Sequence, residues 1–441
     1  MNERNIILIT LDSLRVDHCS FIGYKRETTP TIDKMCNNGL CFTNAYSPST
    51  ATPTSMIGIF TGEHSLVDIT TSTPGKTASF RPWKNELSQR KTLAEMLSRR
   101  GYFTAAFVPN TYVSRYFGFD KGFRYFQDFI PSINSKRSLR SQLHKLIFER
   151  YFQGSKIFTY IEYLWNMLRK REVFKPWEDY YDEIIRLVEK IRKPFFLWIL
   201  ILDTHHPFLP PKTHRQGTNF FTTLYYNLKY MYAIRNPGTK LPKEIIEKII
   251  ELYNSSIRYA DSFINKIWKD LRKHDPVLII HADHGETFGE HGNYGHPPFL
   301  YEENIHVPFI IYNANIKGKV ETPISLLKTM QIILQLVEEK EEFLFENILN
   351  PEKNSPTISM VIDNGIIKIA IRDKEWKFIT NHRKYEDELY NLQKDPYEQQ
   401  NLVLEEPSIA KEMKKTAENY IKLISRKKLL KRIKSIKRKI F

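Results

Sequence analysis

Short apolar runs alternate with longer stretches of mixed polarity along most of the chain. The run at 5–11 contains Ile6-Ile-Leu-Ile9 and is apolar on both faces, as in a central parallel strand that helices cover on both sides. Similar runs occur at 104–108, 195–202, 277–281 and 307–312, and helical patterns occur at 91–100, 177–191 and 241–271. Strands that alternate with helices predict an α/β fold.

Polar residues follow three of these predicted strands. Asp12 ends the first, residues 203–206 (Asp-Thr-His-His) follow the third, and Asp283 with His284 follows the fourth. In α/β sheets, ligands bind outside the carboxyl ends of the strands. We therefore expect these side chains to converge on one edge of the sheet.

The pattern changes after residue 315. Short runs with a period of two at 357–361, 365–372 and 376–380 predict a smaller α+β subdomain. The expected organisation is a large α/β domain at 1–315, with helical excursions at 130–192 and 212–245 over the sheet edge where these side chains meet, a subdomain at 316–415 and a tail helix at 416–441.

The positive charge of the chain is concentrated in its tail. Of the formal net charge of +16 over 441 residues, residues 422–441 contribute ten Lys or Arg and no acid. The body is nearly ordinary in charge, which disfavours nucleic-acid binding by the whole surface. One apolar stripe runs along the predicted tail helix, at Leu429, Ile433, Ile436 and Ile440. Such a helix fits an anionic membrane surface; a helix packed on the body and a nucleic-acid contact are the alternatives.

Composition also bears on location and redox state. No window approaches the roughly 18 uninterrupted apolar residues of a membrane span, and the apolar run near the N-terminus is shorter than the core of a signal peptide. We therefore expect a cytoplasmic protein, with the tail at the inner face of the membrane. Cys19, Cys36 and Cys41 are too few and odd in number for a disulfide framework, so we expect thiols.

The segment His281-Ala-Asp-His-Gly-Glu-Thr-Phe-Gly-Glu-His-Gly-Asn-Tyr-Gly-His296 is the strongest chemical signal. A carboxylate and an imidazole side by side at a strand end can reach one divalent cation, and Asp12 supplies a second carboxylate. The plainer interpretations are a polar loop of exposed histidines, and an Asp12 that caps a helix or turn. A metal site accounts for both segments together.

A second signal is the hydroxyl-rich segment at 47–62. Its pattern predicts a turn that leads into a helix N-terminus, where a hydroxyl would face a bound anion; simple N-capping is the alternative. Sequence chemistry alone leaves Thr50, Thr52, Thr54 and Ser55 open as the hydroxyl that acts.

The order of these segments resembles the sulfatase family of the alkaline phosphatase superfamily. The resemblance rests on Leu11-Asp-Ser-Leu-Arg-Val-Asp-His18, Thr29-Pro-Thr-Ile-Asp33, Thr52-Pro-Thr-Ser55, Asp203-Thr-His-His-Pro-Phe208, Asp283-His-Gly-Glu286 and Glu388-Leu-Tyr-Asn-Leu392, and it covers about residues 4–405. It implies a large mixed sheet sandwiched by helices, with a smaller C-terminal α+β subdomain.

The resemblance also implies a chemistry. Asp12, Asp283 and His284 fall where the family holds a divalent metal ion, and Thr52 falls at the position of the nucleophile, which is itself a metal ligand. His205 and His296 fall where family members contact the transferred anion or protonate the leaving oxygen. The implied partner is an anionic ester substrate, which a glycan or lipid could carry.

Two departures modify this picture. Thr52-Pro-Thr-Ser-Met56 lacks the Cys or Ser, the proline spacing and the arginine of the formylglycine pattern, so Thr52 resembles the nucleophile of phosphonate and phosphodiester hydrolases and of phosphoglycerol and phosphoethanolamine transferases. A threonine sulfate is harder to discharge, which shifts weight from sulfate towards phosphate esters. Ser13 replaces a second aspartate, which favours Mn²⁺ or Zn²⁺ over Ca²⁺ or Mg²⁺.

These observations predict a metal-dependent hydrolase of sulfate or phosphate esters that uses a metal-bound threonine. A head-group transferase acting on a glycan or lipid at the membrane surface, and a non-catalytic binding protein with the same fold, are the alternatives. Among the minor candidates, Arg15 and Asp17 are expected to form a structural ion pair, His291 to lie beside the site or in solvent, and Asn110 and His206 to be secondary.

Overall fold

A large mixed sheet forms the centre of the computed structural model, which describes residues 4–72, 81–130, 175–215, 217–338, 356–381 and 386–440. The strand order is β10-β2-β9-β6-β1-β5-β3-β4, with β11 beside β2. The strands are β1 (Ile6–Leu11), β2 (Leu40–Tyr46), β3 (Phe103–Phe107), β4 (Tyr125–Gln127), β5 (Phe195–Ile201), β6 (Val277–Ala282), β9 (His306–Tyr312), β10 (Gly318–Val320) and β11 (Ile324–Ser325). Only β9 runs antiparallel to its neighbours in this sheet.

The strand at 6–11 is central, as its unbroken apolar sequence predicts. It is buried throughout and pairs in parallel with β5 and β6. Leu11 is level with Ile201 on one side and with Ala282 on the other. The segments after all three strands therefore start at the same sheet edge, which positions the candidate site.

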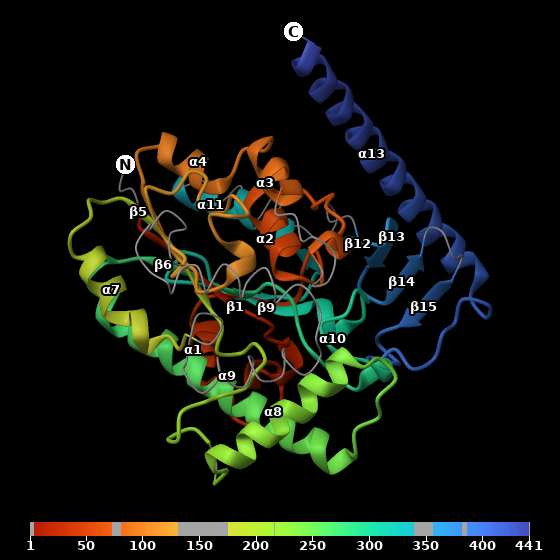
Figure 1. Ribbon diagram of the computed structural model, residues 1–441, viewed down its shortest axis with the longest axis horizontal. Coiled ribbons are helices and arrows are strands. Elements are labelled where there is room, and N and C mark those ends of the chain that lie inside the picture. The colour runs from red at the N-terminus through yellow and green to blue at the C-terminus, as the bar shows by residue number, and fades with distance from the viewer. Residues whose placement is uncertain are drawn as a thin grey trace, which may run out of the picture.

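Helices cover both faces of this sheet (Figure 1). On one face lie α2 (Thr52–Thr61), α3 (Arg81–Ser88), α4 (Leu93–Arg99) and α11 (Thr329–Val337); on the other lie α1 (Pro30–Asn38), α7 (Glu178–Val188) and the long α9 (Lys243–Leu271). The helix α8 (Phe220–Arg235) packs on α9, and the short α10 (Glu302–Ile305) precedes β9. The predicted fold, a mixed sheet between helix layers, is confirmed.

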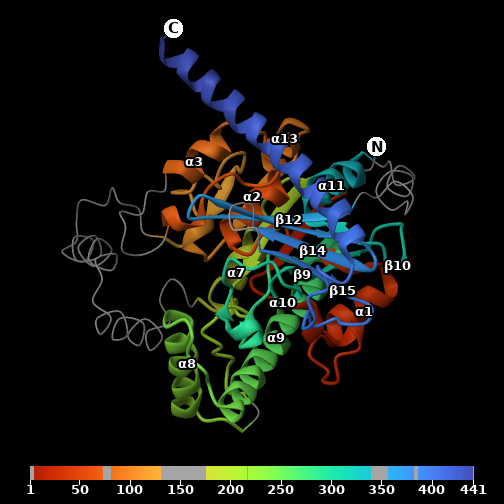
Figure 2. The same ribbon diagram turned by 90° about the vertical axis from the view of Figure 1, so that its right-hand side faces the viewer.

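A second sheet follows in the chain. Its antiparallel strands are β12 (Thr357–Asp363), β13 (Ile366–Arg372), β14 (Trp376–Asn381) and β15 (Asp387–Asn391). The C-terminal helix α13 (Pro407–Ile440) packs its first turns on this sheet and then projects beyond the body (Figure 2). The residues that pack recur every three or four positions: Ala410, Met413, Ala417, Ile421 and Ile424.

The element boundaries differ from the sequence prediction in three places. The strands β10 and β11 belong to the large sheet, although they follow residue 315. The tail helix begins at Pro407 and not at 416, because the apolar positions from Ala410 onward already face the small sheet. Within the expected excursion at 130–192, residues 131–174 lie outside the described residues, and α7 packs in the core through Tyr180, Ile184 and Val188.

The prediction of free thiols was wrong for two of the three cysteines. Cys36, in the last turn of α1, and Cys41, in β2, form a disulfide with a Cα–Cα distance of 4.9 Å. Between them the chain reverses at Gly39, where a Cβ atom would lie 2.5 Å from the carbonyl oxygen of Ile311. Cys19 is a buried free thiol. Among the described helices, none is long and apolar enough to cross a membrane.

Candidate active site

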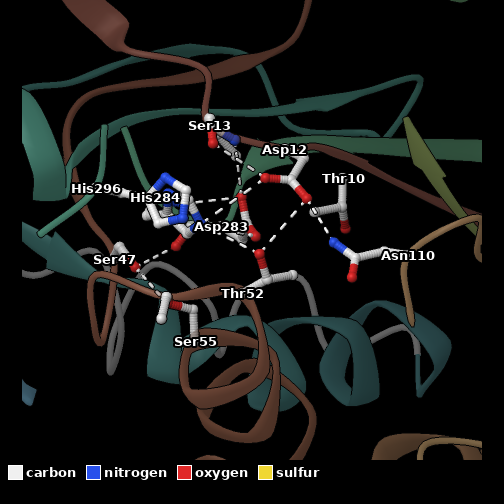
Figure 3. Close-up of polar contacts among 12 residues, drawn as sticks. Thr10, Asp12, Ser13, Ser47, Thr52, Ser55, Asn110, Asp283, His284 and His296 are labelled. Atoms are coloured by element: carbon white, nitrogen blue, oxygen red, sulfur yellow. Dashed lines mark hydrogen bonds and ion pairs between the residues drawn. The ribbon is translucent and has the colours of Figure 1, made fainter. Parts of the chain in front are cut away.

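Two carboxylates and one imidazole meet at the shared carboxyl edge of β1 and β6. His284 Nε2 lies 3.8 Å from Asp12 Oδ1 and 3.6 Å from Asp283 Oδ2, and all three side chains are completely buried. One ligand atom from each residue fits within a group no wider than 4.8 Å (Figure 3). The sequence prediction that these three residues converge is therefore confirmed as geometry.

The donor set fits a divalent cation. His284 Nδ1 lies 2.9 Å from the Gly285 carbonyl oxygen, so this nitrogen carries the proton and Nε2 presents its lone pair to the two carboxylates. Asp283 Oδ2 is buried and has no hydrogen-bond partner among the described residues. Burial and the neighbouring Asp12 carboxylate raise the pKa of Asp283 well above its ordinary value, and burial lowers the pKa of His284. A cation bound by Asp12, Asp283 and His284 would offset the repulsion between the two carboxylates.

Two tight backbone turns hold these ligands. Ser13 adopts a left-handed conformation with φ of 62°, and its amide donates to Asp283 Oδ1 at 3.1 Å. A non-glycine residue in this region is strained, and such residues concentrate at functional sites. Gly285 lies so close to α10 that a Cβ atom would be 1.9 Å from the Glu303 carbonyl oxygen. Residue 285 must be glycine for His284 to keep its place.

Thr52 brings its hydroxyl to the same centre from the first turn of α2. Its Oγ1 lies 3.2 Å from His284 Nε2 and 3.5 Å from Asp12 Oδ2. By contrast, the hydroxyls of Thr54 and Ser55 donate to the backbone carbonyls of Ala51 and Ser49. The geometry thus distinguishes Thr52 from Thr54 and Ser55, whereas the hydroxyl of Thr50 is buried without a hydrogen-bond partner among the described residues. The position at a helix N-terminus also favours a bound anion.

Two further histidines border this centre. The ring of His296 lies 4.6 Å from that of His284, and the ring of His205 lies 5.3 Å from that of His296. His296 Nδ1 lies 3.1 Å from Glu286 Oε2 and its side chain is one-third exposed, which leaves the other ring nitrogen for a ligand. The structure thus brings together all six residues that the sequence selected.

Glu286 is a residue whose role the sequence did not reveal. It is completely buried and accepts hydrogen bonds from His296 and from the Tyr230 hydroxyl of α8, the latter at 2.9 Å. Burial alone would raise its pKa, but the hydrogen bond from His296 and the charges of the surrounding histidines lower the pKa to about 2. Glu286 is thus an anion that fixes the orientation of His296.

Asn110 was only a secondary candidate, yet it reaches the metal-ligand group directly. It follows β3, and its Nδ2 donates to Asp12 Oδ2 at 2.8 Å. Asp12 Oδ1, the oxygen that faces His284, accepts a hydrogen bond from the Ser13 hydroxyl at 3.1 Å. Its position as a polar residue at the end of a predicted strand could have identified Asn110 as a site residue from the sequence.

The remaining secondary candidates are structural. Arg15 and Asp17 form the expected ion pair, with Nη2 and Oδ2 2.7 Å apart. His206 is buried, bonds the Asn227 carbonyl oxygen at 3.1 Å, and has a pKa that burial lowers to about 3. His291 pairs with Glu303 at 3.0 Å, which ties the loop after β7 (Thr287–Phe288) to α10.

The chain is similar to known proteins over most of its length. It is 22% identical to arylsulfatase K of Mus musculus, over 92% of this chain and 77% of that protein, and 24% identical to an arylsulfatase of Clostridium perfringens, over 90% of each. The phosphonate monoester hydrolase of Agrobacterium radiobacter has the same fold, with a TM-score of 0.66, 17% identity and 96% of each chain covered.

A further solved structure, that of BT4656 in complex with its substrate D-glucosamine-2-N,6-O-disulfate, has a TM-score of 0.68 at 18% identity and covers 96% of this chain and 98% of its own. The family model named Sulfatase matches residues 4–339, three-quarters of the chain. The family normally uses a metal ion, in agreement with the Asp-Asp-His group. The chain belongs to the sulfatase family of hydrolases.

Proposed function

We propose that this protein hydrolyses sulfate or phosphate esters, with the Thr52 hydroxyl as the nucleophile. The observation that supports the proposal is the position of Thr52 Oγ1, which lies within 3.5 Å of both Asp12 and His284 at the start of a helix. A hydroxyl needs activation to attack an ester, and an adjacent metal site or base is the usual means.

Asp12, Asp283 and His284 would hold a divalent cation, with Thr52 as a fourth ligand. A cation held there supplies positive charge that favours the ionised hydroxyl and withdraws electrons from the ester. The protein contributes the rest of the environment: Asn110 anchors one oxygen of Asp12, the Ser13 amide anchors Asp283, and the Gly285 carbonyl anchors His284. Mn²⁺ or Zn²⁺ suits the mixed oxygen and nitrogen ligands best.

The proposed reaction has two steps. The Thr52 hydroxyl gives up its proton to solvent and Oγ1 forms a bond to the sulfur or phosphorus. The bond from that atom to the ester oxygen breaks, and the leaving oxygen takes a proton from His296 or His205. Water then gives a proton back to this histidine and attacks the sulfur or phosphorus, and the bond to Thr52 Oγ1 breaks. Oγ1 regains a proton from solvent, and sulfate or phosphate, or a phosphate monoester from a diester, is released. Glu286 keeps the protonated Nδ1 of His296 turned away from the substrate. A phosphothreonine is more readily hydrolysed than a sulfothreonine, so we rank phosphate esters ahead of sulfate esters.

The test compares Thr52→Ala with Thr54→Ala as the matched control, because Thr54 lies on the same helical turn and bonds only a backbone carbonyl. The substrates are an aryl sulfate, a phosphate monoester and a phosphate diester, supplemented by a sulfated glucosamine because BT4656 binds one. We expect Thr52→Ala to lose activity by at least 1,000-fold and Thr54→Ala to retain it. Equal activity in the two variants would refute the nucleophile, and full activity after metal chelation would refute the metal site.

A second candidate reaction is transfer of a phosphorylated head group to a glycan or lipid. The basic tail supports it, since α13 projects from the body and residues 422–441 carry ten Lys or Arg without an acid. An acceptor hydroxyl would then replace water in the second step. Product analysis with and without an added alcohol distinguishes the two reactions. The location at the inner face of a membrane stays a prediction.

A further inference from the structure

The helix α8 carries a row of exposed aromatic side chains. Phe221 is 78% exposed, Tyr225 47% and Tyr232 49%. Residues spaced by four and seven positions share one face of a helix, so these three rings lie in a row along one face. The helix lies at the periphery of the molecule, beside α9 (Figures 1 and 2). Single exposed aromatic residues are common, whereas a row of them marks an interaction surface.

The segment that carries this row is basic. From Thr204 to Lys243 the chain contains six Lys or Arg and no Asp or Glu. Two of the basic residues, Lys229 and Arg235, lie on α8 itself and are exposed. Lys229 Nζ lies 5.5 Å from the centre of the Tyr225 ring, so charge and aromatic surface are interleaved. On the neighbouring α9, Glu247 and Glu251 are paired with Lys243 and Lys248. A partner that is apolar in part and negatively charged therefore suits this face of α8.

The opposite face of α8 is attached to the candidate active site. The Tyr230 hydroxyl lies within hydrogen-bond distance of two acceptors, Glu286 Oε1 at 2.9 Å and the Thr287 carbonyl oxygen at 2.7 Å, which share its one proton, and it accepts from the Gly295 amide at 3.1 Å. Asn227 exchanges hydrogen bonds with the backbone of Phe208, just after the histidine pair at 205–206. Whatever binds the aromatic row is therefore separated from the candidate active site by about the 10–12 Å thickness of one helix.

We propose that α8 docks on the surface of an anionic lipid membrane. Tyrosine and phenylalanine rings suit the boundary between headgroups and acyl chains, and Lys and Arg suit the anionic headgroups around them. The free end of α13, the other acid-free basic segment, lies at the top of Figures 1 and 2, whereas α8 lies at the bottom. The aromatic row and the basic residues of α8 are therefore the attachment site. The proposal does not depend on the reaction at Thr52.

The experiment measures binding of the full chain to vesicles by flotation. The vesicles are phosphatidylcholine alone or phosphatidylcholine with 30% phosphatidylglycerol. The variant Phe221→Ser/Tyr225→Ser/Tyr232→Ser removes the row, and Tyr397→Ser/Leu404→Ser is the control because these residues are 70% and 86% exposed elsewhere on the surface. We expect binding only to the anionic vesicles, at least ten-fold weaker in the triple variant and unchanged in the control.

A second measurement shows whether the triple variant is correctly folded. Hydrolysis of a small soluble ester should be the same in wild type and in the triple variant, because none of the three rings contacts the site. Equal vesicle binding by wild type and triple variant would overturn the proposal. A second outcome would also overturn it: wild type binds heparin but not the vesicles, and the triple variant no longer binds heparin. A sulfated glycan would then be the partner of this face.

Discussion

Lys377 connects the two sheets through a buried ion cluster, and its removal should measurably destabilise the protein. Its ammonium group on β14 lies 2.7 Å from Glu398 Oε1 and 3.0 Å from Glu302 Oε1 in α10. The side chains of Lys377 and Glu398 are fully buried, and that of Glu302 is 15% exposed. Substitution by methionine keeps the length of the side chain but leaves Glu398 without a counter-ion, whereas Glu302 keeps His306 Nδ1 at 3.2 Å.

The expected loss follows from this burial. Removing one partner of a buried ion pair costs about 3–5 kcal/mol, because an uncompensated charge stays in a medium of low polarity. An unfolding entropy of roughly 2.1 cal/mol/K per residue over 441 residues converts this loss into a decrease in Tm of about 3–5 °C. The control is Lys414→Met, since Lys414 pairs with Asp387 at 2.6 Å but is 39% exposed, and a pair of this kind is worth about 0–1 kcal/mol.

Urea unfolding and calorimetry of wild type, Lys377→Met, Lys414→Met and Lys377→Met/Glu398→Gln check this reasoning. Neutralising Glu398 in the double variant should recover at least half of the loss, because one uncompensated charge is then removed. Equal losses for Lys377→Met and Lys414→Met, or no recovery in the double variant, would show that the uncompensated charge is not the cause. The turn at Gly285 should loosen in Lys377→Met, since α10 accepts its backbone hydrogen bonds.

Two more predictions concern the active site and the pH dependence of stability. Glu286→Gln should lower kcat by about 10–100-fold with little change in KM. The loss should be larger for alkyl than for aryl esters, because poor leaving groups depend most on a correctly oriented His296. An equal loss for both ester types would indicate a purely structural role. Asp261 on α9 accepts the Thr31 and Ile32 amides, and burial raises its pKa to about 6. Because the folded state holds a proton that the unfolded state has released, wild type should lose about 2 kcal/mol relative to Asp261→Asn as pH rises from about 4 to 6. Urea titrations at pH 4, 5, 6 and 7 measure this difference, and a constant difference would contradict the shift.

The metal-ligand group could be predicted because each of its parts has a local signal. Asp12 and Asp283 directly follow buried apolar strands, and parallel pairing makes those strand ends level. The composition of the segment around Thr52 left four hydroxyls open as the nucleophile. Only the resemblance to sulfatases selected Thr52 among them.

Contacts between distant segments had no local signal. The role of Glu286 depends on Tyr230, which is 56 residues away in the sequence. The disulfide depends on the close approach of Gly39 to β9, which the spacing of Cys36 and Cys41 does not reveal. The predicted start of α13 was too late. The first apolar positions of this helix pack on the small sheet, and they precede the basic segment on which the prediction of a tail helix was based.

The central place of β1 has a consequence for the order of events during folding. Asp12 and Asp283 lie 271 positions apart, and they become neighbours only when β6 pairs with β1. Closing so long a loop is slow. A cation bound by both carboxylates stabilises only those chains in which β6 has already paired with β1. A nascent chain that has reached α2 carries Asp12 and Thr52 but lacks the other half of the group. Metal uptake during refolding would therefore report completion of the large sheet, at a time when compactness or helix content already looks native.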